Sequence, residues 1–277
     1  VVSLIDYHLW IKWFVVIYIL NIGILAATLL MGENVGGATR WLVLPVIGQI
    51  QPAEFSKLAL ILFFAALFSR YREVISSPIT VLITGVCAAV PLAMILKQPN
   101  LSTTLVCCMV IAAMLFLAGI SYKWILGAFG VLAAAVGAVA YSIFHPENSL
   151  LRGYQLNRIL SWLYPDQYPD LVYQQVNSVM AIGSGMLKGK GLNTTTFESV
   201  KNGNFLSESR TDFIFAIIGE EMGFIGSCAV ILLMAVLVYC CLITAKRAKD
   251  TAGKLIAGGI GALLACHSFV NIGVATF

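Results

Sequence analysis

The sequence predicts an all-α, polytopic membrane protein, and three observations carry that prediction. Hydrophobic residues make up 60% of the 277 positions and charged residues only 11%, whereas a soluble domain has about 25% charged residues. The mean hydropathy is +0.91. Mostly apolar runs also recur at about the 20-residue length that a helix needs to cross the hydrocarbon layer.

Seven such runs are expected to be transmembrane helices. In chain order they cover residues 10–31, 50–69, 78–97, 101–119, 124–144, 212–245 and 254–277. All seven cysteines lie inside these runs, where a free thiol behaves as a small apolar group, so neither a disulfide framework nor a cysteine metal site is indicated. Because the chain starts and stops within apolar runs, we expect a fragment that lacks helices at both ends.

The distribution of Lys and Arg predicts the orientation of these helices, since short loops rich in both residues face the cytoplasm. Such loops follow the second, fourth and sixth runs and contain Arg70, Arg72, Lys123, Lys246, Arg247, Lys249 and Lys254. They alternate with the loop around Arg40, the turn at Lys97 and the long segment 145–210, which are therefore expected to be extracytoplasmic. Asp212 then stands at the outer end of its helix.

The long extracytoplasmic loop, residues 145–210, is expected to lie against the outer leaflet. Its stretch RILSWLYPDQYPD, at 158–170, is dense in Trp and Tyr, which settle at the membrane interface. Tyr173, Val176 and Met180 then recur at helical spacing. This spacing predicts a short amphipathic helix.

Glu54 and Lys57 are three residues apart in an apolar run and therefore share a helix face. Two interpretations have equal weight at this point. The residues form a neutralised ion pair that fixes helix packing, or they are a charged element of a substrate path. Ionisable residues within a membrane are functional candidates by default.

Three further polar groups have mainly structural interpretations. The stretch 97–100 predicts a tight turn, because Pro99 breaks the helix. The glycine-rich stretch 181–192 carries two lysines that suit an anion, but no strand precedes it, so a flexible turn is the better interpretation. The three histidines are His8, His145 and His267. They are scattered along the chain, so they are expected to serve packing or the membrane interface rather than a metal.

Asp212 is the main candidate for chemistry. A carboxylate at a helix start is a common structural device, worth about 0.5 to 2 kcal/mol. Here, however, Arg210 precedes it and Glu208 lies one turn back, at the predicted outer surface. In such a half-wet setting a carboxylate can act as a general base or bind a divalent cation. Glu220 and Glu221 lie about two to three turns deeper and are interpreted as structural partners within the bundle.

Six ordered motifs resemble those of the SEDS family, which comprises RodA, FtsW and SpoVE. They are GATRW (37–41), QPAEFSK (51–57), KQPNLSTT (97–104), YQQVNSVMAIGSGMLKGKG (173–191), FLSESRTDFIFAIIGEEMGFIG (205–226) and FVNIG (269–273). The resemblance covers nearly the whole chain and is stronger to RodA than to FtsW. It implies a single transmembrane domain over residues 1–277, holding the end of the second through the ninth helix of a ten-helix fold.

The resemblance implies a peptidoglycan glycosyltransferase that polymerises lipid II into glycan strands. The reaction would take place at the outer face of the bacterial cytoplasmic membrane, during cell elongation and shape determination, with a class B penicillin-binding protein as partner. The essential carboxylate of the family falls on Asp212, and its intramembrane ion pair falls on Glu54 and Lys57. Nothing in the resemblance implies a nucleic-acid partner.

In this reaction the 4-hydroxyl of one lipid-linked disaccharide attacks the anomeric carbon of another and expels undecaprenyl pyrophosphate. Asp212 would activate that hydroxyl or hold a divalent cation, Mg²⁺ or Mn²⁺, on the pyrophosphate. Basic groups at the outer side would stabilise the charge that develops on the leaving group. The candidates for this binding role are Arg40, Lys97, Arg158 and Arg210.

Departures from the family motifs and the intramembrane charges keep two other functions open. The usual Asp of QPDLGT is Asn100, its usual Gly is Ser102, the second Gln of YQxxQS is Asn177, and FLPE reads FLSE. These departures suit an inactive membrane scaffold for a penicillin-binding protein. The ion pair and the broken helices suit a lipid II flippase, which needs charged groups near the midplane, whereas a polymerase needs them at the outer leaflet.

Overall fold

The computed structural model describes residues 6–35, 38–44, 48–144, 160–161, 163–192, 206 and 211–276. It divides into two compact units. The first unit combines Val1–Ser121 with Ala235–His267, and the second combines Tyr122–Met234 with Ser268–Phe277. The single transmembrane domain stays a prediction.

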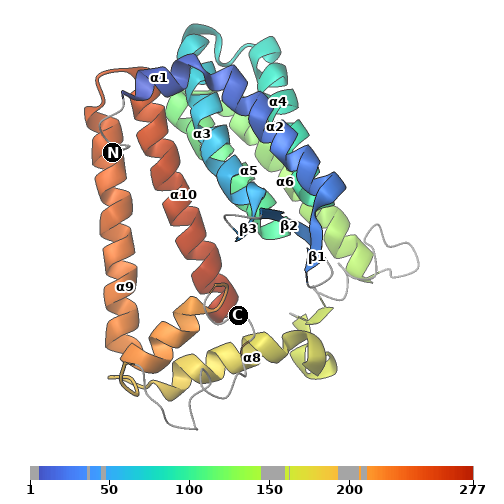
Figure 1. Cartoon of the computed structure of the whole chain (residues 1–277), viewed down its shortest axis with the longest axis vertical. Coiled ribbons are helices and arrows are strands. Elements are labelled where there is room, and N and C mark those ends of the chain that lie inside the picture. Colours follow the sequence, from blue (N-terminus) through green and yellow to red (C-terminus); the bar gives the residue numbers. More distant parts are fainter. Residues whose placement is uncertain are drawn as a thin grey trace. The chain divides into compact units, whose positions relative to one another are not determined.

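The structure is mostly helical, as predicted (Figure 1). Its helices are α1 (Tyr7–Lys12), α2 (Phe14–Met31), α3 (Pro52–Arg70), α4 (Pro78–Lys97), α5 (Leu101–Ala118), α6 (Tyr122–Phe144), α8 (Pro169–Ser184), α9 (Ile214–Arg247) and α10 (Thr251–Thr276), with single turns η2 (Arg72–Val74) and η4 (Pro165–Gln167). Within the described residues, six of them, α2, α3, α4, α5, α9 and α10, are long and apolar enough to cross a membrane. α6 occupies the place of the remaining predicted span. The polytopic all-α class is therefore confirmed.

Local sequence signals explain where these helices begin. α3 and α4 start at Pro52 and Pro78, because a first-turn proline gives up an N–H that has no helical partner anyway. α5 starts after Asn100, whose side-chain oxygen accepts a hydrogen bond from the Thr103 amide at 3.2 Å. The predicted turn at 97–100 is thus confirmed, since α4 ends and α5 begins on either side of it.

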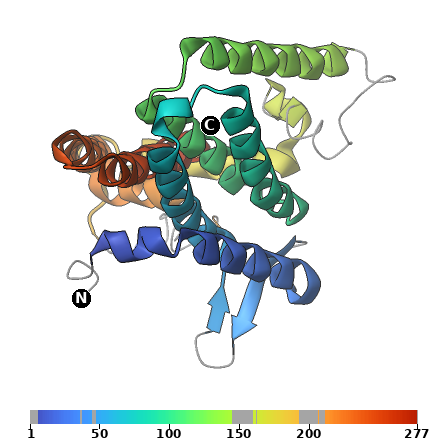
Figure 2. The same ribbon diagram turned by 90° about the horizontal axis from the view of Figure 1, so that it is seen from above.

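The loop between α2 and α3, which is predicted to be extracytoplasmic, contains a small sheet that the apolar patterning did not predict. Its strands β1 (Glu33–Val35), β2 (Ala38–Leu44) and β3 (Gly48–Ile50) pair antiparallel in the order β1-β2-β3. Figure 2 shows strands projecting from the α2 side of the first unit. Arg40 therefore stands on a strand rather than in an irregular loop.

In the first unit α3 is the central helix, with α2 and α5 packed against it (Figure 1). Aromatic rings fill this core. Phe63 stacks on Tyr18 of α2 with ring centroids 4.2 Å apart, and Phe64 stacks on Phe68 at 5.3 Å. α3 is consequently buried over most of its length, although it is apolar enough to face lipid.

The first part of α10 reaches α3 and α5 through two adjacent glycines. A β-carbon on Gly259 would lie 2.9 Å from Ile61 and 3.1 Å from Met114, and one on Gly258 would collide with Leu117. Small residues allow helices in a membrane to approach closely. These glycines therefore set the position of the part of α10 that carries His267.

The predicted cytoplasmic end of the first unit is tied together by Asp250, in the loop between α9 and α10. Burial raises its pKa, but hydrogen bonds from the Tyr7 hydroxyl and the Gly253 amide outweigh burial and lower the pKa below its ordinary value. The same bond raises the pKa of Tyr7 to about 12. The contact joins α1 to the α9–α10 loop at one end of the unit.

In the second unit α8 packs against the first turns of α9. Their shared core consists of Ala181, Leu206, Phe213, Ala216 and Ile217. α8 is the predicted amphipathic helix, and its Tyr173, Val176 and Met180 are exposed. These apolar side chains are therefore available to an outer leaflet. The Ser178 hydroxyl also donates to the Ala275 carbonyl at 2.6 Å, which ties α8 to the end of α10.

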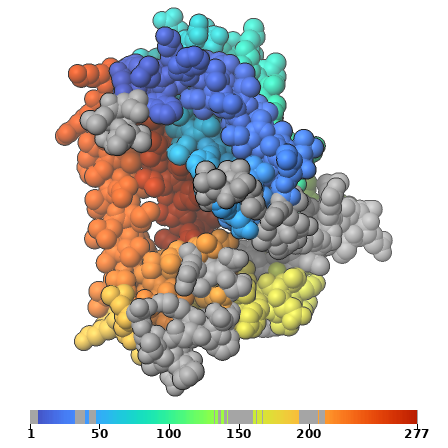
Figure 3. All heavy atoms as spheres, viewed as in Figure 1, coloured from blue at the N-terminus to red at the C-terminus, as the bar shows by residue number. Residues whose placement is uncertain are grey.

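Atoms of the orange helix α9 are visible at the surface in Figure 3. Its later turns present apolar side chains outward. Leu232 and Leu233 are each 65% exposed. Exposed leucines on a helix of this length are what a lipid-facing helix requires.

The topology can be tested by labelling single cysteines in a background freed of the native ones. We expect the Leu192→Cys variant to react with a membrane-impermeant maleimide in intact cells, because Leu192 is exposed and lies in the predicted outer segment. The Lys249→Cys variant, in the predicted cytoplasmic loop, is the matched control and should react only after permeabilisation. The reverse pattern would show that the orientation is wrong.

Candidate functional site

Asp212 lies in the turn 211–213, directly before α9, and its side chain is exposed. The predicted position at the start of the helix is confirmed. Asn271 of α10 fixes the main chain at this point. Its side-chain amide donates to the carbonyl oxygens of Thr211 at 3.3 Å and of Asp212 at 3.2 Å. The backbone of the candidate carboxylate is therefore anchored while its side chain remains accessible.

α9 is broken nine residues beyond its Ile214 start, at Gly223, which has φ 67° and ψ −165°. Only glycine adopts this backbone region readily. The segment from Ile214 to Met222 is thus a half-helix, and Asp212 lies just before its N-terminal end. The continuous span predicted over 212–245 is wrong in this respect.

Residues 186–191, which we call the clasp, close the break. A continuous helix would join the Phe224 amide to the Glu220 carbonyl and the Ile225 amide to the Glu221 carbonyl. Instead, the two amides donate to the Met186 and Leu187 carbonyls at 2.8 and 3.2 Å. The two carbonyls accept from the Lys190 and Gly191 amides at 2.9 and 3.0 Å. All four groups freed by the break are therefore bonded to the clasp.

Glycines allow this close approach. A β-carbon on Gly189 would collide with the Glu221 carbonyl, and one on Gly223 would collide with the Gly189 amide. Gly189 and Gly191 also have φ of +80° and +100°, a region that favours glycine. The glycine-rich stretch is therefore not the flexible turn that the sequence suggested.

Lys190 also provides the charge partner of Glu220. Its Nζ lies 2.8 Å from Glu220 Oε1, and the side chains are 23% and 0% exposed. A buried carboxylate is tolerated only with such a partner. The structural interpretation of Glu220 is thereby supported, and its partner comes from the clasp.

In the first unit Lys57 forms a three-part contact rather than a simple pair. Its Nζ lies 2.7 Å from both carboxylate oxygens of Glu54 and 2.5 Å from His267 Nε2. An ammonium has three N–H donors and no acceptor, so these contacts use all three and His267 accepts through Nε2. Lys57 is 2% exposed, whereas Glu54 is 50% exposed. The predicted pairing of Glu54 with Lys57 is present, and Glu54 is its accessible member.

Arg40 reaches the turn that follows Lys97. Its guanidinium donates to the Gln98 and Pro99 carbonyls at 3.2 and 2.5 Å. Lys97 ends α4 and is exposed. The structure thus brings two of the four predicted substrate-binding cations to one end of the first unit. The other two, Arg158 and Arg210, lie outside the described residues.

Among the residues that the structure describes, no three His, Cys, Asp or Glu side chains form a group that could hold a metal ion. Mg²⁺, however, is commonly held by one or two carboxylates together with substrate phosphates. A single exposed carboxylate such as Asp212 fits that arrangement. The divalent cation stays a prediction.

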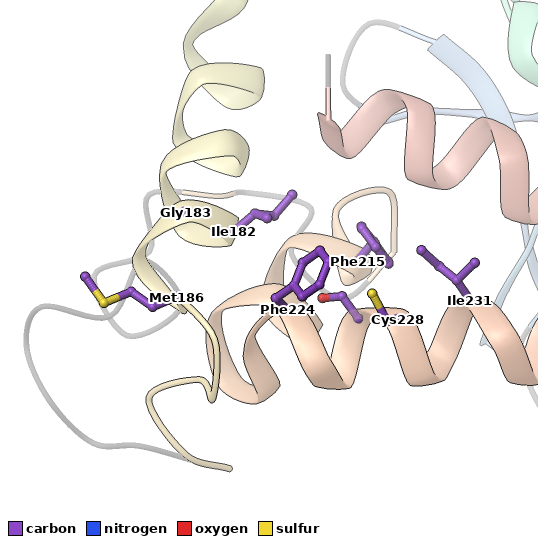
Figure 4. A pocket seen from close by; sticks show the side chains of 8 residues that line it. Ile182, Gly183, Met186, Phe215, Phe224, Cys228 and Ile231 are labelled. Carbon is purple, nitrogen blue, oxygen red and sulfur yellow. The ribbon is translucent and has the colours of Figure 1, made fainter.

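An apolar cavity of about 400 Å³ lies between α8 and both parts of α9. It is lined by Ile182, Gly183, Met186, Phe215, Phe224, Ser227, Cys228 and Ile231. In Figure 4 the side chains of Ile182, Phe215 and Phe224 converge on this space, whereas Met186 points away from it. The lining suits a hydrocarbon chain, and Phe215 is only one turn from Asp212.

Fold and site together define a multi-pass membrane protein with an exposed carboxylate at the start of a broken helix. The chain belongs to the FtsW/RodA/SpoVE family of cell cycle proteins, whose model matches residues 1–276. Together with its apolar helices, this membership makes it a multi-pass protein of the bacterial cytoplasmic membrane.

Two curated relatives show how far the similarity extends. The chain is 35% identical over 280 residues to the probable peptidoglycan glycosyltransferase FtsW of Trichlorobacter lovleyi, covering 98% of this chain and 69% of that protein. It is 33% identical over 268 residues to the peptidoglycan glycosyltransferase MrdB of Escherichia coli K12, covering 95% and 68%. The chain therefore spans about two thirds of their length. A closer relation to RodA than to FtsW stays a prediction.

Solved structures share the fold. A peptidoglycan synthase complex, described as coordinating polymerization and crosslinking, matches with a TM-score of 0.77 at 24% identity, covering 98% of this chain and 73% of that one. The rod shape determining protein RodA of Thermus thermophilus matches with a TM-score of 0.64 at 21% identity, covering 96% and 67%. At such identities the likeness shows the polytopic helical fold.

Proposed function

We propose that this protein is a peptidoglycan glycosyltransferase that polymerises lipid II at the outer face of the cytoplasmic membrane. Relatives at 33% and 35% identity carry that enzyme name. The observation that carries the proposal is the exposed Asp212, held by Asn271 at the predicted outer end of α9. A polymerase needs a reactive carboxylate at that level, where the lipid-linked sugars lie.

The proposed chemistry requires a group that removes a proton from the attacking 4-hydroxyl. Asp212 can take that proton directly, or it can hold a divalent cation on the leaving pyrophosphate. Both functions need an accessible side chain on a fixed backbone. The contacts from Asn271 to the main-chain carbonyls fix the backbone, and the side chain of Asp212 is exposed.

Two further features suit the substrate. Arg40 and Lys97 lie at one end of the first unit and carry the positive charge that a pyrophosphate leaving group needs. Arg158 and Arg210 are proposed for the same task on their sequence positions alone. The apolar cavity beside Phe215 would take part of the isoprenoid chain.

We further propose a class B penicillin-binding protein as partner and cell elongation as the process served. A solved relative is described as a synthase complex that coordinates polymerization and crosslinking, which supports a crosslinking partner. The assignment to elongation rests on the motifs that resemble RodA.

The alternatives fit the geometry less well. A flippase needs charged groups near the membrane midplane, but Glu54 lies in the first turn of α3. The scaffold alternative depended partly on Asn100 in place of an aspartate. Asn100 still caps α5, and asparagine is as good a cap as aspartate. This departure therefore leaves the local structure intact.

The proposal is tested by purifying the protein that contains this chain and incubating it with labelled lipid II and the penicillin-binding partner. We expect glycan strands on a gel. A parallel assay measures transfer of lipid II across vesicles. Transfer without strands would support the flippase, and neither activity would support the scaffold.

A further inference from the structure

The clasp makes four backbone hydrogen bonds at the break that ends the half-helix after Asp212. A backbone amide or carbonyl that loses its helical partner costs free energy unless another group bonds to it. The break at Gly223 frees four such groups, and the clasp provides a partner for each of them. The half-helix therefore has one favoured orientation, the one in which all four bonds form.

The half-helix is held at both ends. At its outer end Asn271 bonds the carbonyls of residues 211 and 212. At its inner end the clasp bonds the carbonyls of Glu220 and Glu221. From Ile214 to Met222 the helix is about 12 Å long, so a tilt of about 5° at the break would move Asp212 by about 1 Å.

Lys190 strengthens the inner attachment through its side chain as well as its backbone. The side chain pairs with the fully buried carboxylate of Glu220, and the amide of the same residue bonds the Glu220 carbonyl. Lys190 thus binds both the side-chain carboxylate and the backbone carbonyl of Glu220. Without the ammonium, the Glu220 carboxylate would turn or draw in water, and the clasp would loosen.

We propose that Lys190 is a positioning residue for Asp212. By pairing with Glu220 it holds the half-helix in the orientation in which the carboxylate reaches the attacking hydroxyl. The inference rests on the proposed glycosyltransferase function. It assigns to Lys190 an effect on the rate of the chemical step rather than on substrate binding, because a displacement of about 1 Å can slow a reaction by about 10²-fold.

The first test compares four proteins in the lipid II assay: wild type, Lys190→Arg, Lys190→Met and the double variant Lys190→Met/Glu220→Gln. We expect Lys190→Met to lower kcat by about 10- to 100-fold with KM little changed. Lys190→Arg keeps the charge and should stay near wild type. The double variant removes the buried charge together with its partner, so it should recover most of the lost kcat. A higher KM that the double variant does not correct would instead show direct substrate contact and overturn the proposal.

The second test does not depend on activity. Spin labels on Ile214→Cys and Leu232→Cys, both exposed and on opposite sides of the break, report the distance across Gly223. We expect one narrow distance distribution in the wild-type background and a broad one in Lys190→Met. If Lys190→Met does not fold, Lys190→Gln takes its place, since it can still donate a hydrogen bond without the charge.

The two tests separate the inference from the function. A wild type that makes no strands would refute the proposed function, and the distance measurement would still decide whether Lys190 holds the half-helix. An unchanged distance distribution in Lys190→Met would overturn the inference even if strands are made.

Discussion

The Asp212→Asn variant is expected to polymerise lipid II about 10²- to 10⁴-fold more slowly than wild type, because asparagine cannot accept the proton of the attacking hydroxyl. It is also a much weaker cation ligand than a carboxylate. The protein should fold normally, since the contacts from Asn271 go to main-chain carbonyls, which the substitution retains. Asparagine also keeps the size of the side chain and any capping bond at the helix start.

A matched control is available in the same unit. Asp170 is an exposed carboxylate in the first turn of α8, and the Asp170→Asn variant should retain normal activity. The measurement is the yield of glycan strands on a gel from equal amounts of the three proteins, with the penicillin-binding partner present. Equal strands from wild type and Asp212→Asn would return Asp212 to a purely structural helix-start role.

A chelator distinguishes the two functions open to Asp212. If the carboxylate holds Mg²⁺ or Mn²⁺ on the pyrophosphate, wild-type activity should disappear in the presence of the chelator and return when the metal is added back. If it acts as the base alone, wild type should be insensitive to the chelator. In both cases Asp212→Asn stays inactive.

The positions of the helices could be predicted from local sequence, because each segment that crosses lipid has to meet the physical requirements by itself. A segment that crosses the membrane has to bond its own backbone and be apolar over its whole length. The run predicted at 78–97 is α4, Pro78–Lys97, and the run at 101–119 is α5, Leu101–Ala118. Their starts at Pro78 and after Asn100 are visible in the sequence itself.

The break in α9 had no comparable local signal. Glycine occurs often in membrane helices, so Gly223 alone does not mark an interruption. The groups that make the break tolerable lie in the clasp, more than 30 residues earlier in the chain. The sheet before α3 was missed for a related reason, because its strands β1 and β3 have only three residues each.

Some contacts of the candidate site could likewise be predicted from local sequence, and others could not. Glu54 and Lys57 were paired correctly because three residues of helix bring them to one face. His267, Asn271 and Lys190 were not assigned to their partners, because each meets a residue that lies 30 or more positions away. Only the fold brings such residues together. The residue type shows that a side chain is polar, but it does not indicate which distant residue is its partner.

The second large effect is expected at the Glu54–Lys57 pair, and it should be asymmetric. Glu54→Ala leaves the 2% exposed ammonium of Lys57 without its counter-charge, which costs about 3 to 5 kcal/mol for a buried pair. Lys57→Met leaves Glu54, which is 50% exposed and can bind water, so the expected loss is only about 1 to 3 kcal/mol. Folded protein in the membrane and its melting temperature should fall more for Glu54→Ala.

His267 provides an internal check on this asymmetry. Because Lys57 uses its third donor on His267 Nε2, His267→Leu should cost about 1 to 3 kcal/mol by leaving that donor unpaired. His267→Gln, the matched control, supplies an amide oxygen as acceptor and should cost less. In the charge-swapped double variant Glu54→Lys/Lys57→Glu, the histidine can donate from Nε2 to the new carboxylate, so stability should be partly restored. Normal levels and melting temperature for Glu54→Ala would show that the pair is dispensable. Equal losses for Glu54→Ala and Lys57→Met would show that the two charges are buried alike.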